Sequence, residues 1–276
     1  MNNRPIGHAD AAPGPTPPIL AHKDHGAPSV FEPQALLREA RRQRGVPLID
    51  VPTVCVLDPD GDIVRHLRRT GAARPSRGWA CYHTEMFEFD LEGGTAGIVG
   101  CAVGAPFAVL VAEQLFASGC RLLISITSAG QITEIGPPPY FVAIDRALRD
   151  EGTSYHYLPP GEFADADAAL IARAEEAVRA ASLPIYRGPT WTTDAPFRET
   201  SAAIAAAQAR GALAVEMEAA ALYAFAAARN KPVICYAHVT NTMGQVHGDF
   251  EKGEGDGSAA SLKVIAATVM AHRDGL

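Results

Sequence analysis

The stretch VGCAVGAPFAVLVAEQLFASGCRLLISITSAGQ, from Val99 to Gln131, decides the fold of this chain. Its first residues complete an apolar run that starts at Thr95 and is typical of a strand. Ala108 to Ser118 then repeats apolar residues at a helical period and stops at Gly119. Arg121 to Ile126 is a short, largely apolar run of strand length. A strand, a helix and a strand in this order predict a parallel βαβ unit.

The same alternation continues on both sides of this unit. We expect further strands at Val51–Leu57, Phe87–Leu91, Tyr140–Ile144 and Val233–Val239. We expect helices at Pro33–Arg44, Ala164–Ala181, Ile204–Arg210, Ala219–Arg229 and Ser261–His272. Gly93 and Gly94 separate the strand that ends at Leu91 from the run at Thr95–Val103 and predict a hairpin. The whole pattern predicts an α/β protein built as a three-layer αβα sandwich.

Residues 1–28 differ in composition from the rest of the chain. This segment is rich in proline, glycine and alanine, and it cannot bury enough apolar surface to offset the entropy of ordering it. We therefore expect a disordered, proline-rich arm. Residues 29–276 show no internal repeat and are long enough to bury one large core. They predict a single catalytic domain.

Composition narrows the class of partner. The chain has 276 residues and a formal net charge of -7, so no basic field is present to hold a nucleic acid, and a small metabolite is the expected partner. No run of about 18 apolar residues and no signal-like apolar segment is visible, which predicts a soluble, cytoplasmic protein without a membrane partner. Five scattered cysteines without CxxC spacing argue against disulfides and against a zinc site, so we expect no metal.

Polar residues follow two of the expected strands, where ligands bind in open α/β sheets, and a third polar group precedes the expected helix at Ala219–Arg229. The first group is Thr127–Gln131, whose small residues let a ligand approach the backbone. The others are Thr240–Thr242 and the pair Glu216 and Glu218, two carboxylates in an otherwise apolar stretch. Buried carboxylates need polar partners. These two could cap the amides of the following helix, or one of them could accept hydrogen bonds from sugar hydroxyls.

The segment AVEMEAAALYAF, Ala214 to Phe225, resembles the V-E-M-E-A-A signature of the hexameric nucleoside phosphorylase superfamily, which includes uridine phosphorylase and bacterial purine nucleoside phosphorylase. Val99 to Gln131 is similar to that family's strand, G-x-G-x-P-S loop, helix and following strand. The resemblance covers roughly Asp50 to the C-terminus. It implies a mixed, partly barrel-like central sheet, a nucleoside as the small-molecule partner, and a homo-oligomer, either a dimer or a trimer of dimers.

The resemblance also implies roles for individual residues. Glu218 would hold the ribose hydroxyls, Met217 would pack on the sugar, and Glu216 would support them. Ser128 would contact phosphate and sugar, and Gly104 and Gly130 would also belong to the substrate-binding site. Phe197 could stack on the base, and Arg198 could bind a carbonyl oxygen of the base, as a catalytic residue together with Glu218 and Asn241. Asn241 stands where purine-specific members place an aspartic acid. Because its amide can stabilise an anionic base but cannot protonate it, uracil or a 6-oxopurine suits this site better than adenine.

The sequence departs from the family at the phosphate site. The phosphorylases bind phosphate with a Gly-Asp-Pro-x-Arg loop and a second arginine, because a dianion needs amides and guanidinium groups around it. Here Leu57 replaces the glycine of that loop, Gly61 replaces its arginine, and Ser125 replaces the second arginine. Asp58 and Asp60 would repel phosphate unless other cations compensate. Nearby arginines that could fold back or come from a neighbouring subunit are Arg65, Arg68, Arg69, Arg74 and Arg77.

Three functions follow from the resemblance and its gaps. The first is a pentosyltransferase, a nucleoside phosphorylase that cleaves the N-glycosidic bond to free base and pentose 1-phosphate, with inorganic phosphate as co-substrate and no other cofactor. The second is a nucleosidase that uses water, as the missing arginines favour. The third is a nucleoside-binding protein without catalysis, which kept Glu216 and Glu218 and lost the phosphate site.

Overall fold

The computed structural model describes residues 16–92, 94–243, 250 and 252–273. Its strands are β1 (Val54–Asp58), β2 (Ala73–Pro75), β3 (Met86–Leu91), β4 (Gly94–Gly100), β5 (Leu122–Gln131), β6 (Tyr140–Asp150), β7 (Phe163–Asp165), β8 (Ile185–Thr193), β9 (Ala214–Glu216) and β10 (Val233–Asn241). Its α-helices are α1 (Pro33–Arg44), α2 (Asp62–Arg69), α3 (Ala105–Ala117), α4 (Ala168–Ala180), α5 (Ser201–Ala209), α6 (Ala219–Arg229) and α7 (Ser258–His272). Two short 3-10 helices, η1 (Ser154–His156) and η2 (Pro196–Arg198), lie in loops.

All ten strands belong to one mixed sheet. Nine follow the order β10-β6-β8-β9-β5-β1-β4-β3-β2, and β7 lies off this path and pairs with β6. β10 also pairs with β5, so the strands β10, β6, β8, β9 and β5 close into a ring. The remaining strands extend the sheet from β5 as an open part, in which β1 is parallel to both β4 and β5. This confirms the predicted mixed, partly barrel-like sheet.

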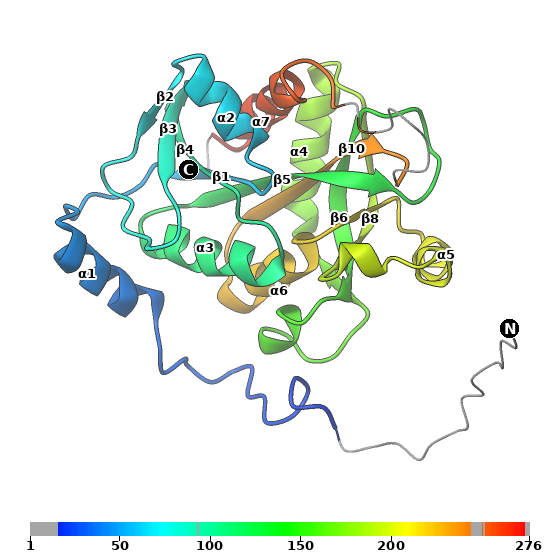
Figure 1. Cartoon of the computed structure of the whole chain (residues 1–276), viewed down its shortest axis with the longest axis horizontal. Coiled ribbons are helices and arrows are strands. Elements are labelled where there is room, and N and C mark those ends of the chain that lie inside the picture. Colours follow the sequence, from blue (N-terminus) through cyan, green and yellow to red (C-terminus); the bar gives the residue numbers. More distant parts are fainter. Residues whose placement is uncertain (1–15, 93, 244–249, 251, 274–276) are drawn as a thin grey trace, which may run out of the picture.

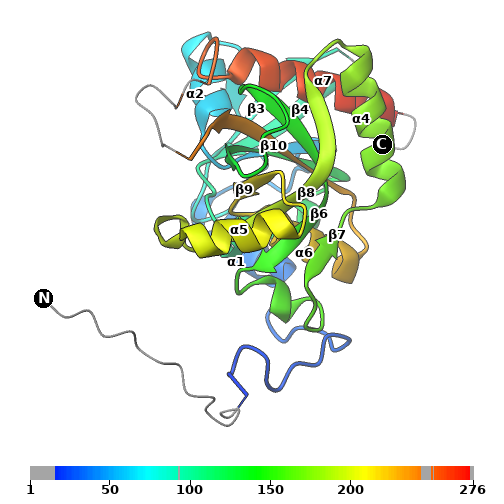
Figure 2. The ribbon, with the colours of Figure 1, turned by 90° about the vertical axis from the view of Figure 1, so that its right-hand side faces the viewer.

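Helices cover the sheet on both faces, which confirms the three-layer sandwich (Figure 1). On one face, α3 and α6 bury apolar side chains against the sheet in one core cluster. On the other face, α2, α4 and α7 form a second cluster with it, and α4 and α7 pack against each other (Figure 2). α5 belongs to neither layer, because it packs with Trp191 and Val215 in a separate small cluster beside the ring. α1 lies outside α3 through Leu37 and Ala40.

Most predicted elements are present with shifted ends. α1 ends where the sequence indicates, at Gly45, which takes the left-handed conformation with a φ of 65°. The predicted βαβ unit is confirmed as β4, α3 and β5, with β1 inserted between the two strands. Several elements were not predicted: the short strands β2, β7 and β9, and the longer α2 and β8. α2 is only 8 residues long, although its buried residues Ile63, Val64 and Leu67 lie on one face of the helix. β8 contains arginine, glycine and proline and shows no regular apolar alternation.

Tyr223 of α6 reaches the sheet at the point where β6 and β10 separate. The antiparallel pairing of these strands ends at Tyr236 and Ala143. At the next position the Tyr223 hydroxyl donates to the Ile144 carbonyl at 2.6 Å and accepts from the Cys235 amide at 3.0 Å. The hydroxyl therefore satisfies two buried backbone groups that the strands no longer give each other.

The first 15 residues of the predicted arm lie outside the described part of the chain. Residues 16–32 form turns and bends that run along the outside of the domain (Figure 1). Lys23 Nζ lies 3.0 Å from His156 Nδ1, and His25 Nε2 lies 3.2 Å from the Tyr155 carbonyl. Within the described residues, no helix has the length and apolar character needed to span a membrane.

Candidate active site

Three strand ends bring the predicted site residues together. Asn241 of β10 is in register with Gly130 of β5, and Gly130 is also paired with Val215 of β9. Thr192 of β8 is in register with Glu216. The polar residues that follow separate apolar runs in the sequence therefore meet at one place in the ring.

Glu218 is buried, with only 1% of its surface exposed, and its carboxylate makes one hydrogen bond among the described residues. Its Oε1 accepts the amide of Gly104 at 2.7 Å, so the loop before α3 touches this carboxylate directly. Its Oε2 is buried and has no hydrogen-bond partner among the described residues. Burial, followed by the charge of Glu216, raises the pKa of Glu218 to about 8. Among the described residues no hydrogen bond reaches Oε2, although the nearby Thr127 hydroxyl acts to lower the pKa of Glu218.

Glu216 is in the opposite situation, because four donors surround its carboxylate. Oε1 accepts the hydroxyls of Thr190 at 3.1 Å and Thr192 at 2.5 Å. Oε2 accepts the amides of Glu218 and Ala219, each at 2.7 Å. Burial raises its pKa, and these hydrogen bonds act against the shift. Glu216 thus caps the first amides of α6, the structural alternative that the sequence left open for this pair.

The Gly130 backbone is covered by a methionine. A Cβ at Gly130 would lie 2.3 Å from Met243 Sδ, so only glycine allows this contact. Asn241 supports the same loop, since its Oδ1 accepts the Met243 amide at 2.9 Å. Among the described residues, Asn241 Nδ2 makes only long hydrogen bonds, 3.4 Å to the Ala129 carbonyl and 3.3 Å to Thr240 Oγ1. These partners hold the amide hydrogens of Asn241 weakly.

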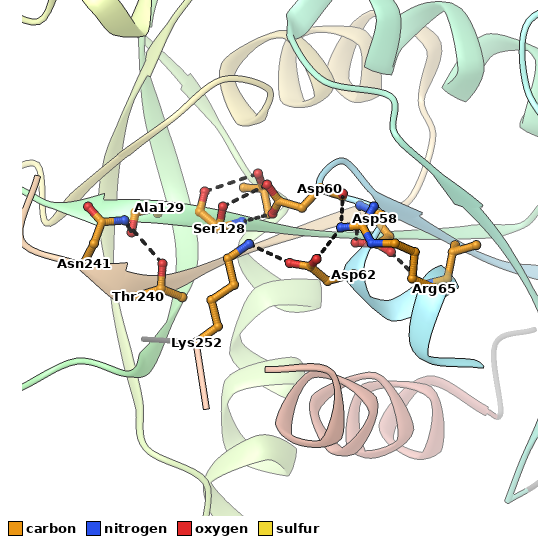
Figure 3. A network of polar contacts seen from close by, with 12 residues as sticks. Asp58, Asp60, Asp62, Arg65, Ser128, Ala129, Thr240, Asn241 and Lys252 are labelled. Carbon is orange, nitrogen blue, oxygen red and sulfur yellow. Dashed lines mark hydrogen bonds and ion pairs between the residues drawn. The ribbon is translucent and has the colours of Figure 1, made fainter. Parts of the chain in front are cut away.

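Ser128 meets a carboxylate of its own chain. The Ser128 amide donates to Asp60 Oδ2 at 2.7 Å, and the Ser128 hydroxyl donates to Asp60 Oδ1 at 2.9 Å (Figure 3). Asp60 stands in the loop after β1, which lies beside β5 because Leu57 is paired with Ser125. Both donors of the residue expected to contact phosphate are thus already occupied.

The rest of this corner is also acidic. Asp58 accepts the amides of Gly61 at 3.1 Å and Val64 at 2.9 Å, and burial raises its pKa to about 7. Asp62 forms ion pairs with Arg65 and, at 2.6 Å, with Lys252 (Figure 3). Asp58, Asp60 and Asp62 line one small cavity together with Ser128, His238, Lys252 and Asp256.

The three replaced phosphate positions have different surroundings. Leu57 and Ser125 are buried in the sheet, where they are paired with each other. Gly61 has a φ of 76°, and a Cβ there would lie 2.8 Å from Arg65 Nη1. Arg65 also donates to the Asp60 carbonyl at 3.0 Å. The Arg65 guanidinium therefore folds back over the position at which the family carries an arginine.

The residues expected to meet the base lie at the edge of the site. Phe197 and Arg198 form part of η2, which follows β8, and both are exposed, Phe197 completely. Met217 is half-buried between the two glutamates. The structure thus joins Gly104, Glu216 and Glu218 by direct contacts, while Phe197 and Arg198 project into solvent. Their proposed contacts with a base stay predictions.

Sequence reasoning did not identify several partners. Thr190 and Thr192, which bind Glu216, come from β8, a strand that was not predicted. Asp60 was noted for its charge, but nothing in the sequence placed it on Ser128. Lys252 lies 190 residues from Asp62 and had no recognisable signal. Among the described residues, no group of three or more His, Cys, Asp or Glu side chains is arranged to hold a metal ion.

The sheet that closes into a ring between helical layers, with buried carboxylates where its strands end, defines an α/β protein with a candidate small-molecule site. The model of the phosphorylase superfamily matches residues 53–270, and the chain belongs to this family. It is 29% identical over 143 residues to a DeoD-type purine nucleoside phosphorylase of Myxococcus xanthus. That match covers 51% of this chain and 60% of the relative's length.

A solved structure shares the fold. The uridine phosphorylase of Vibrio fischeri superposes with a TM-score of 0.69 and 21% sequence identity. The match covers 82% of this chain and 95% of the other. This likeness confirms the fold class that the sequence predicted.

Proposed function

We propose that this chain cleaves the N-glycosidic bond of a nucleoside by phosphorolysis, giving free base and pentose 1-phosphate. The observation that carries this proposal is the buried Glu218 Oε2, which has no partner among the described residues and lies beside Met217 in the family's signature segment. An unsatisfied buried oxygen costs free energy, and a sugar hydroxyl would supply the missing donor.

The protonation state of Glu218 fits such a role. With its pKa near 8, the side chain is largely neutral at pH 7 in the unliganded protein. Sugar hydroxyls that donate to the carboxylate favour its charged form, as does positive charge on the sugar in a dissociative transition state. Binding and catalysis would then both draw on the same carboxylate. The weakly held Asn241 amide would stabilise the departing base.

Two observations favour phosphate as the nucleophile. The relative and the solved structure reported above are phosphorylases by name, one of purine nucleosides and one of uridine. In addition, the Arg65 guanidinium lies over Gly61 and would supply the positive charge that the family obtains from its loop arginine.

One observation favours a second candidate, hydrolysis. The Asp60 carboxylate occupies both donors of Ser128, so a dianion cannot bind there without displacing it. With phosphate excluded, water would attack the sugar and release a free pentose.

Base release from uridine, inosine, guanosine, adenosine and methylthioadenosine, with and without phosphate, tests both candidates. Phosphate-dependent release with pentose 1-phosphate would support phosphorolysis, and phosphate-independent release of free sugar would support hydrolysis. We expect uridine or a 6-oxopurine nucleoside to be preferred, because Asn241 cannot protonate adenine. Thermal stabilisation by a nucleoside with no release under any condition would overturn both and leave a binding protein.

The Glu218→Gln variant tests the carboxylate itself. We expect kcat/KM to fall by about 100-fold, because the amide cannot carry the negative charge that the transition state needs. Glu176→Gln, an exposed change on α4, is the matched control and should keep full activity. A kcat/KM of Glu218→Gln within about threefold of the unmodified protein would contradict the proposed role of this carboxylate.

A further inference from the structure

Ser128 offers the kind of site that binds a small oxyanion. Its amide and its hydroxyl point toward the same place, at the end of β5 beside the loop after β1. A carboxylate and a phosphate present the same acceptors to such a pair of donors. The Asp60 carboxylate fills this place with one oxygen on each donor (Figure 3).

The charges around the Ser128 donors disfavour the binding of a second anion. Asp58, Asp62 and Asp256 line the same cavity. The cations there are few: Lys252 is paired with Asp62, and burial keeps the pKa of His238 at about 4, so its ring is neutral. Phosphate added to this cavity while Asp60 remains in place would meet repulsion from these carboxylates, opposed only by Lys252 and by Arg65 over Gly61, both of which are paired with Asp62.

Asp60 is held in a way that permits withdrawal. Its side chain is only half-buried, and it bonds to Ser128 alone among the contacts the structure records for it. Its backbone is fixed separately, since its carbonyl accepts from Arg65. The amides of Gly61 and Val64 bond to Asp58 and not to Asp60. Rotation of the Asp60 side chain would therefore free Ser128 without disturbing the turn.

We propose that Asp60 is an internal competitor of inorganic phosphate, whose carboxylate occupies the Ser128 donors and decides whether phosphate enters the site. This inference rests on the proposed function, because the group bound to the Ser128 donors would decide whether phosphate or water is the nucleophile. It makes Asp60 a specificity-determining residue that the family motif does not identify.

Isothermal titration of inorganic phosphate into the full chain tests the inference by binding alone. Relative to the unmodified protein, Asp60→Ala should bind phosphate at least about tenfold more tightly, because two charge-assisted donors become available and one repulsive charge is lost. Asp60→Asn should gain less, since its amide oxygen can still accept from Ser128. Thermal unfolding of each variant shows that it is folded.

Two controls separate this effect from a general change in charge. Asp256→Asn removes a carboxylate from the same cavity without touching Ser128, and should leave the dissociation constant for phosphate within about twofold. The double variant Asp60→Ala, Ser128→Ala should lose the gain. Equal affinity of the unmodified protein and Asp60→Ala, including no measurable binding to either, would overturn the inference, as would an equal gain in Asp256→Asn.

Failure of the inference and failure of the proposed function are distinguishable. Tighter phosphate binding by Asp60→Ala, with no base release from any nucleoside by any variant, would leave the inference intact and remove the enzyme. Phosphate-dependent base release by the unmodified protein, with an unchanged phosphate affinity in Asp60→Ala, would do the reverse.

Discussion

Two glutamates separated by one residue have entirely different surroundings. Glu216 has four donors on its carboxylate, and Glu218 has one. The sequence shows both as carboxylates in an apolar stretch and cannot say which is satisfied internally, because two of the four donors to Glu216 come from a strand more than 20 residues away. Only the contacts separate a fixed structural carboxylate from one that remains open to a ligand.

The raised pKa of Glu218 predicts a dependence of stability on pH. The unfolded chain releases this proton near pH 4.5, whereas the folded chain holds it until about pH 8. Between these values the folded state binds more protons, so the free energy of unfolding should fall as pH rises, by at most about 1.4 kcal/mol per pH unit from this group. Urea unfolding at a series of pH values measures the slope.

Glu218→Gln should remove this part of the slope, leaving the variant close to the unmodified protein at pH 4.5 and relatively more stable at pH 8. Asp58, whose pKa is raised to about 7, contributes a second slope in the same direction. Asp58→Asn should therefore retain the Glu218 contribution and serves as the comparison. Identical slopes in Glu218→Gln and the unmodified protein would show that Glu218 titrates normally in the folded state.

At the scale of elements, prediction followed apolar periodicity. α6 was predicted with the observed ends, Ala219 and Arg229, because its run is apolar and stops at Asn230, which takes a left-handed conformation. β8 was missed because its stretch, IYRGPTWTT, mixes charged, glycine and proline residues. It forms a strand because β6 and β9 pair with it on both sides, a tertiary effect that no local pattern contains.

The junction of β8, β9 and α6 depends on Glu216. Glu216→Ala would leave two buried hydroxyls and two buried amides without their acceptor. Because each unsatisfied buried group costs about 1–3 kcal/mol, we expect a loss of at least about 3 kcal/mol in the free energy of unfolding, visible in chemical denaturation. Glu176→Gln, at an exposed position of α4, should change the free energy of unfolding by less than about 0.5 kcal/mol. A loss below about 1 kcal/mol for Glu216→Ala would contradict the role of this cap.

At the scale of the whole molecule, the layers were predictable and the closure of the ring was not. Alternating strands and helices predict an αβα sandwich from periodicity alone. The ring depends on β10 pairing with both β5 and β6, which only the resemblance implied. The sequence predicted that the phosphate site departs from that of the family. It did not predict that Asp60 binds Ser128, because the two residues are 68 residues apart. The homo-oligomer stays a prediction.

One continuous sheet predicts one cooperative unfolding transition. β1 to β10 join residues from Val54 to Asn241, so neither half of the chain has a sheet of its own. The two tryptophans report on both halves, since Trp79 and Trp191 are each buried. Trp79→Phe and Trp191→Phe leave one fluorophore each.

Within each tryptophan variant, fluorescence and far-ultraviolet circular dichroism should give the same denaturation midpoint. Two separated midpoints would divide residues 29–276 into independent units and contradict a single catalytic domain.

The Tyr223 hydroxyl links the shape of the ring to the position of the site carboxylate. It occupies one rung of the ladder between Ile144 and Cys235, and it belongs to the helix that begins directly after Glu218. Little more than the first turn of this helix separates Glu218 from Tyr223. Any loosening that lets β6 and β10 come apart at this rung therefore also shifts Glu218. The protein cannot keep a competent site while its sheet frays there, so fraying and loss of substrate affinity should appear as a single event.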